Sequence, residues 1–479
     1  MAVLLVAAIA STDLGASLSA YDGGIGASSA TFTLHGLLPY RDYWLLYGPA
    51  SGLLVAIPTW VFGPSLEVLR IFGLAALCVQ ALITFRLSRI WAAPGPAVAL
   101  TIAAVVMLPA LLGLDASAWL VAMTFALLAI YLSVGTGRSG VVVGVVVGLA
   151  FLSRLDVGVY ALVATLLVRD RTKVLIGFAV IAIPFIACLV ATTPVAALVE
   201  QLVWYPIVGP RQFRGLVDPG IAIGQTAATL LTLPLILIPR LAIVLAIIRL
   251  AREAVQRRWS AASTGLLGLV AFAAACQLQT LGRGDFEHFA QAAAPAILSL
   301  SVWFPSARMG ASRFAVLAGT VAGCVVVGLV GHRFHADSAY DHNLRAASAW
   351  IRSATRTDER IFVGLTSNRY TIANPLIVYY LADRAPGVRD TMFNPGVTNT
   401  DWGQARMVAD LASSDTPFLV LDRVFAEQHE MTPDGRTPGS TRLDEYIGAH
   451  YRAICDMGTL VIMARNDRPE PSRCPDASS

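Results

Sequence analysis

Apolar segments long enough to cross a bilayer recur over the first two thirds of the chain, with short polar connections between them. Because a transmembrane helix needs about 20 mostly apolar residues, this pattern predicts about eleven spans. Segments 139–153 and 157–169 are short, which favours tilted or half-depth helices there. The expected spans are residues 2–20, 66–86, 96–113, 116–134, 139–153, 157–169, 173–193, 221–248, 261–281, 287–304 and 313–331.

Composition agrees with a polytopic membrane protein. The chain is 56% hydrophobic and 14% charged, with a mean hydropathy of +0.65. Soluble domains carry about 25% charged residues. A net charge of +4, spread among apolar segments, does not predict nucleic-acid binding.

Arginines gather in alternate connections, which is the bias expected of cytoplasmic loops. The intervening connections, among them 21–65, 194–220 and 282–287, then face the outside together with the region after residue 332. We therefore predict a multi-pass protein of the plasma membrane with a cytoplasmic N-terminus. The basic loops carry Arg86, Arg89, Arg138, Arg169, Arg171, Lys173, Arg249, Arg252, Arg257, Arg258, Arg308 and Arg313.

The chain becomes polar after residue 332. We predict an extracytoplasmic α/β domain at 333–465, following a transmembrane domain at 1–332, and a disordered tail at 466–479. Outside the cytoplasm a disulfide between Cys455 and Cys474 is allowed, although the sequence does not require it. Strands are expected at Arg360 to Leu365, Pro417 to Asp422 and Thr459 to Ala464, and helices at Leu344 to Ser353 and Asn374 to Ala382.

The first outer connection, 21–65, holds a dense group of polar and aromatic side chains. Such residues beside a membrane are costly unless they face water, a cavity or a substrate. Asp22 follows the first span among glycines, which let the backbone turn and a substrate approach. Its carboxylate could take a proton from an acceptor hydroxyl, or it could cap a helix that begins near Ile25. Residues 49–62 are predicted to form a helix in the membrane interface.

The segment YRDYWLLYGP, residues 40–49, carries further candidates for substrate binding. Arg41 could hold a phosphate, and Asp42 could hold a metal, a sugar hydroxyl or Arg41 itself. The rings at 43, 44 and 47 could stack on a sugar face. The alternative is an interfacial aromatic belt with a local ion pair. The aromatic candidates are Tyr40, Tyr43, Trp44 and Tyr47.

Two later outer connections also combine arginine with acidic residues. An arginine near the hydrocarbon costs about 2.5–3.5 kcal/mol, which an anionic phosphate would offset. Arg154 and Asp156 lie in SRLDVG, where an ion pair closing a hairpin is the alternative. Arg283, Asp285 and His288 lie in GRGDFEH, where a helix capped by Asp285 is the alternative to a phosphate or metal site.

These segments, taken in order, resemble the GT-C superfamily of polyprenyl-phosphate-sugar-dependent membrane glycosyltransferases. The similarity is to the branch of the protein O-mannosyltransferases and aminoarabinose–lipid A transferases, and it covers most of residues 20–305. The corresponding elements are Asp22 after the first span, the YRDYWLLYGP stretch and the interfacial helix ending in Phe62–Gly63. SRLDVG and GRGDFEH resemble the family's two R-x-D elements. One departure is Gly23, because many relatives have glutamate there.

The resemblance implies a hexosyl- or pentosyltransferase of cell-envelope and cell-wall biogenesis. It would move a sugar from a polyprenyl-phosphate carrier in the membrane lipid to an extracytoplasmic glycan, lipid or protein acceptor. Asp22 would be the general base, with Asp42 supplying any role of the missing glutamate. The sequence requires no cofactor and leaves a divalent metal open. The leaving phosphate would be stabilised by Arg41, Arg154, Arg283 and His288.

Two other functions use the same residues differently. A transporter or flippase for a lipid-linked sugar would place charges near the midplane and often shows repeated halves. Here the charges lie at one face and the sequence shows no repeat, which disfavours this alternative. A non-catalytic scaffold on the same fold would have no need of Asp22, Arg41, Asp42, Arg154 and Asp285 together.

Overall fold

The structure is a computed structural model that divides into two compact units. Unit 1 comprises 1–16, 70–186 and 216–336, and unit 2 comprises 17–69, 187–215 and 337–479. Unit 2 thus adds two earlier segments to the C-terminal region that the sequence predicts as one domain. The residues described are 2–11, 20–105, 114, 117–135, 139–208, 226–282, 286–333, 339–369, 373–426, 439–469 and 474.

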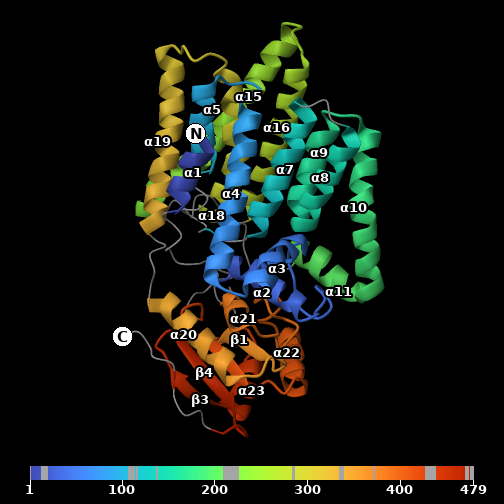
Figure 1. Ribbon diagram of the computed structural model, residues 1–479, viewed down its shortest axis with the longest axis vertical. Coiled ribbons are helices and arrows are strands. Elements are labelled where there is room, and N and C mark those ends of the chain that lie inside the picture. The colour runs from blue at the N-terminus through green and yellow to red at the C-terminus, as the bar shows by residue number, and fades with distance from the viewer. Residues whose placement is uncertain are drawn as a thin grey trace. The chain divides into compact units, whose positions relative to one another are not determined.

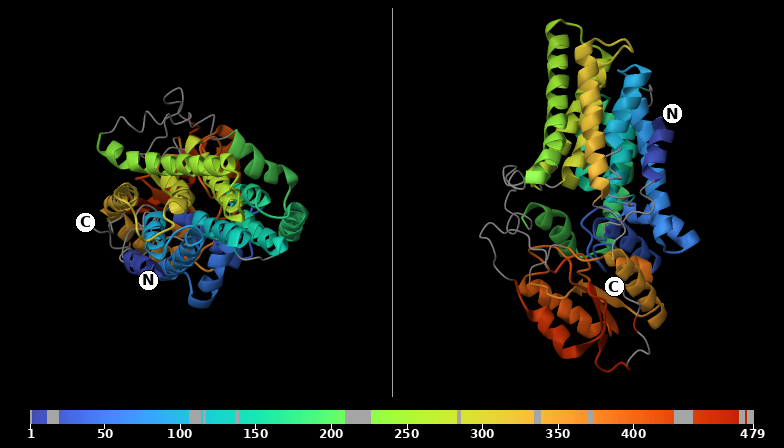
Figure 2. Two further views of the ribbon diagram at one scale, coloured as in Figure 1. Left: turned by 90° about the horizontal axis from the view of Figure 1, so that it is seen from above. Right: turned by 90° about the vertical axis from the view of Figure 1, so that its left-hand side faces the viewer.

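Unit 1 is built of helices that run side by side (Figures 1 and 2). A helix lies at every predicted span, and α4 and α10 continue into unit 2. The helices are α1 (Ala2–Ser11), α4 (Leu66–Ser88), α5 (Pro94–Val105), α7 (Ala118–Gly135), α8 (Gly140–Ser153), α9 (Leu155–Leu166), α10 (Arg171–Thr192), α15 (Thr226–Val255), α16 (Ala261–Gln277), α17 (Gln279–Gly282), α18 (Phe286–Ser299) and α19 (Ala311–Arg333). A short 3-10 turn, Leu300–Trp303, follows α18.

Two helices of the described ranges, α4 and α10, are long and apolar enough to cross a membrane. Shorter apolar helices among the described residues include α5, α8 and α16. The number of spans and the orientation of the termini therefore stay predictions.

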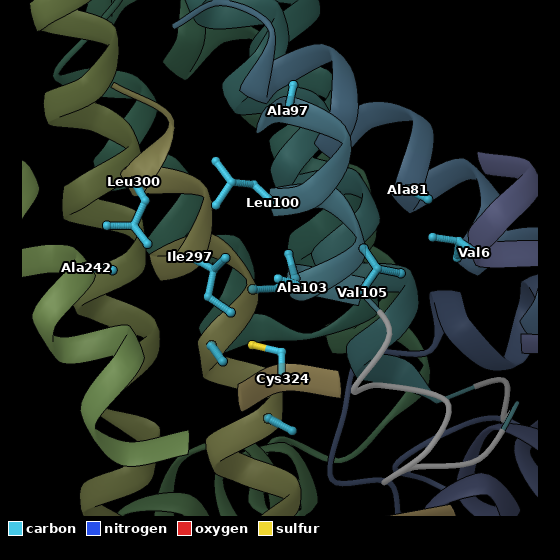
Figure 3. Close-up of a cluster of buried hydrophobic side chains, with 14 of the residues drawn as sticks. Val6, Ala81, Ala97, Leu100, Ala103, Val105, Ala242, Ile297, Leu300 and Cys324 are labelled. Carbon is cyan, nitrogen blue, oxygen red and sulfur yellow. The ribbon is translucent and has the colours of Figure 1, made fainter. Parts of the chain in front are cut away.

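Small residues let the helices of unit 1 approach closely. Ala97 and Ala103 of α5 lie in a buried cluster with Ile297 of α18 and Cys324 of α19 (Figure 3). A Cβ on Gly144 of α8 would lie 2.0 Å from the carbonyl oxygen of Val174 in α10. Such backbone contact requires a residue without a side chain, as in many membrane helix pairs.

Unit 2 contains a four-stranded sheet of order β1-β2-β4-β3. β1 (Ile361–Leu365) runs parallel to β2 (Phe418–Asp422), with Ile361 opposite Phe418. β4 (Leu460–Arg465) is antiparallel to β2 and to β3 (Tyr451–Asp456). The three predicted strands are confirmed as β1, β2 and β4. The sequence prediction missed β3, in which only two residues are buried.

Helices cover this sheet and extend unit 2 (Figure 1). The predicted helices at 344–353 and 374–382 correspond to α20 (Ala339–Ala354) and the shorter α21 (Ile377–Ala382). α22 (Asp401–Ser413) and α23 (Arg442–His450) were not predicted. The remaining elements are α2 (Asp22–Leu34), α3 (Ala50–Phe62), α11 (Val195–Val199), the π-helical turn Glu200–Trp204 and α12 (Tyr205–Ile207).

Ordered contacts extend into the C-terminal segment that the sequence predicts to be disordered. Cys455 of β3 forms a disulfide with Cys474. The predicted disordered tail begins at 466, but the backbone N–H of Asn466 donates to the carbonyl of His450. The side chain of Arg468 also pairs with Glu359. Residues 470–473 and 475–479 lie outside the described residues.

Asp422 ends β2 as a fully buried carboxylate. It accepts hydrogen bonds from the hydroxyl of Tyr340 at 2.5 Å and from the backbone N–H of Phe425 at 2.6 Å. Burial raises the pKa of Asp422 to about 6, although these hydrogen bonds oppose the shift. The folded unit therefore binds this proton more tightly than an exposed aspartate would.

We predict a pH-dependent stability that Asp422→Asn removes. Because the folded pKa lies above the ordinary value of 3.8, ionisation destabilises the folded state. The contribution is fully present below about pH 4 and is lost as the pH rises through about 6, amounting to at most about 3 kcal/mol. Thermal unfolding in detergent should show the Tm of Asp422→Asn rising relative to wild type from pH 4 to 6 and levelling above. The exposed Asp401→Asn is the control, and an equal pH dependence in all three proteins would contradict the assignment.

Candidate functional site

Asp22 is the first residue of α2 and belongs to unit 2. The helix begins there, three positions before Ile25, and the preceding Tyr21 makes no side-chain capping bond. The N-cap position of α2 is therefore occupied by Tyr21, and Asp22 follows it as the first helical residue. A carboxylate in the first helical turn is favoured by the helix dipole. Its side chain is half-buried, so part of it is accessible.

The glycines after Asp22 serve packing inside unit 2. A Cβ on Gly24 would lie 2.6 Å from the backbone nitrogen of Ile377. The N–H of Ile377 donates to the carbonyl of Ala20 at 3.1 Å. α2 and α21 thus meet backbone to backbone at this position. The sequence interpretation, in which the glycines make room for a substrate, does not describe Gly24.

The loop between α2 and α3 is held in a specific conformation. Tyr40 has a φ of 66°, which is unfavourable for a residue with a side chain. Its hydroxyl donates to the carbonyl of Tyr47 at 2.7 Å, and its N–H donates to the carbonyl of Tyr43 at 3.0 Å. The buried Gln201 donates from Nε2 to the carbonyl of Tyr40 and accepts the N–H of Leu45. These bonds hold the strained residue in place.

Three of the predicted aromatic ligands are core residues of unit 2. Tyr40, Tyr43 and Trp44 are each at most 1% exposed. The hydroxyl of Tyr43 is 2.9 Å from that of Ser29, and the ring of Trp44 packs edge-on against Tyr205. Stacking on a sugar requires an open ring face, which these three residues do not have in this structure. Tyr47 is half-buried, and its stacking on a sugar stays a prediction.

Arg41 and Asp42 form a bidentate ion pair. The Nε and Nη2 atoms of Arg41 each lie 2.8 Å from a carboxylate oxygen of Asp42. Asp42 also accepts the N–H of Leu38 at 2.8 Å. Partial burial would raise the pKa of Asp42, but the bonds from Arg41 and Leu38 outweigh it and lower that pKa. A carboxylate with a lowered pKa is a weak base near neutral pH. The catalytic role of Asp42 stays a prediction, with its carboxylate already engaged by Arg41 and Leu38 in this structure.

A polar groove adjoins this pair within unit 2. Its volume is about 540 Å³, within the range of about 300–1,000 Å³ common for small-molecule sites. The charged residues lining it are Arg41, Asp42, Arg360, Arg389 and Asp410. The loop thus contributes one ion pair to a groove otherwise lined mainly by C-terminal residues.

A charged network connects Glu200 of the π-helical turn to the C-terminal region. Glu200 accepts hydrogen bonds from Arg389 at 3.1 Å and from Arg406 at 3.0 Å. Arg406 also makes a bidentate pair with the fully buried Asp390, at 2.6 and 2.8 Å. Burial raises the pKa of Asp390, and the pairing with Arg406 opposes that shift. Nothing in the sequence distinguishes these residues, because isolated charges in polar segments usually face solvent.

Arg154 and Asp156 lie in unit 1, where the ion pair expected as the alternative is present. Arg154 Nε lies 2.9 Å from Asp156 Oδ1, and its guanidinium lies 4.9 Å from the centre of the Trp119 ring. Asp156 also accepts from Gln279 Nε2 at 3.0 Å and from the N–H of Val157 at 2.9 Å. This pair joins α8, α9 and α17.

The remaining predicted residues lie near the start of α18. His288 lies in α18 and is half-buried, whereas Arg283 and Asp285 lie outside the described residues. Within the described ranges, no group of three or more His, Cys, Asp or Glu side chains is placed to hold a metal ion. Asp22, Arg41 and Asp42 belong to unit 2, and Arg154, Asp156 and His288 belong to unit 1.

The fold is similar to solved structures of GT-C glycosyltransferases over almost the whole chain. ArnT from Cupriavidus metallidurans aligns with a TM-score of 0.57 in the apo state and 0.55 bound to undecaprenyl phosphate, at 13% and 12% identity. Both alignments cover 96% of this chain and 97% of ArnT. The Archaeoglobus fulgidus oligosaccharyltransferase, tethered to an acceptor peptide, aligns with a TM-score of 0.52 at 14% identity, over 95% of this chain and 78% of that one. No family model and no curated protein matches the sequence.

We predict that Asp42→Asn and Asp42→Ala have different effects on stability. The asparagine side chain can still accept the N–H of Leu38, whereas alanine leaves it unpaired. Loss of that bond should lower the unfolding free energy by about 1 kcal/mol in Asp42→Ala, measured by denaturant unfolding in detergent. Asp42→Asn should stay near wild type and keep most of the sugar transfer proposed below. If both variants were stable yet inactive, Asp42 would be a catalytic group.

Proposed function

We propose that this chain, which has the GT-C fold, is an integral membrane glycosyltransferase that uses a polyprenyl-phosphate-linked sugar. The observation that carries the proposal is the extent of the fold likeness, because 96% of this chain aligns with 97% of ArnT, including the structure bound to undecaprenyl phosphate. A fold alone does not define a reaction. The chemistry is therefore assigned to particular residues.

Asp22 is proposed as the general base. A hydroxyl of the acceptor attacks the anomeric carbon of the donor while Asp22 removes its proton, and the bond from that carbon to the phosphate oxygen breaks. The configuration at the anomeric carbon is inverted. Asp42 is less suited to this role, because the bidentate contact with Arg41 lowers its pKa. Its place in the first turn of α2 fixes the carboxylate on a rigid element, which a positioned base needs.

The leaving phosphate is proposed to be stabilised by arginines. Arg41 is oriented by Asp42 and remains exposed, so it is suited to a phosphate oxygen. Arg154, Arg283 and His288 keep the phosphate-binding role that the family resemblance implies. Arg154 would retain its contacts to Asp156 and the Trp119 ring while it binds. The proposed location is the plasma membrane, and the acceptor is an envelope glycan, lipid or protein.

Replacing Asp22 by asparagine should abolish sugar transfer. The amide is nearly isosteric but cannot accept the acceptor proton, and loss of general-base catalysis typically lowers rates about 10²–10⁴-fold. The measurement is transfer from radiolabelled polyprenyl-phosphate sugars in membranes of a strain lacking this chain, supplied with wild type or Asp22→Asn. The labelled product would also identify the acceptor.

A matched control is Asp358→Asn, which removes an exposed carboxylate of unit 2 that pairs only locally with Arg356. It should transfer at the wild-type rate. Equal transfer by Asp22→Asn and wild type, at equal expression, would make Asp22 structural. Absence of transfer from every donor, with lipid-linked sugar accumulating on one leaflet, would instead support the flippase alternative.

A further inference from the structure

One face of α22 carries three large or charged side chains in register. Trp402, Arg406 and Asp410 are spaced four residues apart, which places them above one another on a helix. Asp410 lines the polar groove, and Arg406 joins the network of Glu200. This face of α22 therefore runs from the polar groove at Asp410 to the surface around Trp402.

The exposed Trp402 and the half-buried Trp204 form an aromatic surface, here called the aromatic platform. Their rings are 6.4 Å apart and edge-on, and the guanidinium of Arg406 lies 5.0 Å from the centre of the Trp402 ring. Trp402 is 45% exposed although Trp204 and Arg406 both pack against its ring. A large ring that is fixed and yet open to solvent is a rigid binding surface rather than a core residue.

Charges along this strip cancel. Four arginines (Arg41, Arg360, Arg389 and Arg406) are matched by four carboxylates (Asp42, Asp390, Asp410 and Glu200). Three of these arginines are engaged in ion pairs. Beyond the single phosphate contact proposed for Arg41, the strip carries no excess of charge that would favour a strongly anionic or strongly cationic ligand. A neutral ligand rich in hydroxyls would find both donors and acceptors in the groove, together with the hydroxyls of Ser413 and Ser414.

We infer that the strip from the aromatic platform to the polar groove binds a neutral glycan chain, which is the acceptor in the proposed reaction. The apolar face of one sugar unit lies on Trp402, and units further along hydrogen-bond to side chains of the groove. The inference rests on the proposed function in calling this glycan the acceptor. The binding itself is a separate property and is measured separately.

The test is equilibrium titration of the purified full chain in nanodiscs with neutral oligosaccharides. The probes are mono- to hexasaccharides of mannose, glucose, arabinofuranose and galactofuranose, with oligogalacturonate as an anionic counterpart. Affinity should rise with chain length in at least one neutral series and not in the anionic one. Trp402→Ala should weaken binding of the longest chain by about fivefold or more, and Trp402→Phe, which keeps a ring face, should restore most of it. Trp60→Ala, which removes an exposed ring from α3, should leave affinity unchanged.

The inference is overturned if no neutral series binds with length dependence, or if Trp402→Ala binds as tightly as wild type. It is also overturned if the ring faces lipid, in which case Trp402→Ala would instead reduce fluorescence quenching by brominated lipids. Sugar transfer from the lipid-linked donor is measured on the same preparations. Binding without transfer would mean that the proposed function has failed, whereas transfer without length-dependent binding would mean that the glycan strip has failed.

Discussion

Buried backbone groups of the loop between α2 and α3 must find hydrogen-bond partners, and the structure of unit 2 depends on how they do so. Gln201, which is fully buried, satisfies the carbonyl of Tyr40 and the N–H of Leu45 with one amide. The carbonyl of Arg389 accepts the N–H of Trp44 at 2.7 Å. An unpaired buried amide group costs about 1–3 kcal/mol, so these contacts determine the loop's conformation. The position of Arg41 follows from them.

The helices of unit 1 and most strands of unit 2 could be predicted from the sequence. Apolar length predicted the helices of unit 1, and runs of buried residues predicted β1, β2 and β4. α22 was missed because only Gly403, Gln404, Met407 and Leu411 are buried in it, which is a thin apolar stripe for a helix. β3 was missed for a similar reason. Periodicity identifies an element by its buried face, and these elements bury little.

The candidate site was only partly predictable, because residue type does not reveal which partner a side chain has. Tyr43 and Trp44 have the composition of a sugar-stacking surface, yet their burial makes them core. Asp22 and Asp42 are both aspartates of one loop region, and only the structure distinguishes a half-buried helix-start carboxylate from one already bonded to Arg41 and Leu38. Glu200 gave no indication in the sequence, since its partners lie about two hundred residues away.

The ion pairs of the outer-loop arginines also bear on whether these arginines bind a phosphate. From the sequence alone, arginines in outer loops are costly charges that an anion must offset, but carboxylates already pair with Arg41 and Arg154. Such pairing does not prevent phosphate binding. Asp42 engages Nε and Nη2 of Arg41, leaving the Nη1 donors of the guanidinium without a partner in the described chain. A guanidinium held on one side by a carboxylate loses less rotational freedom when it binds a phosphate on the other. The ion pair is therefore compatible with a preorganised phosphate contact, in which Asp42 contributes orientation and Arg41 contributes charge.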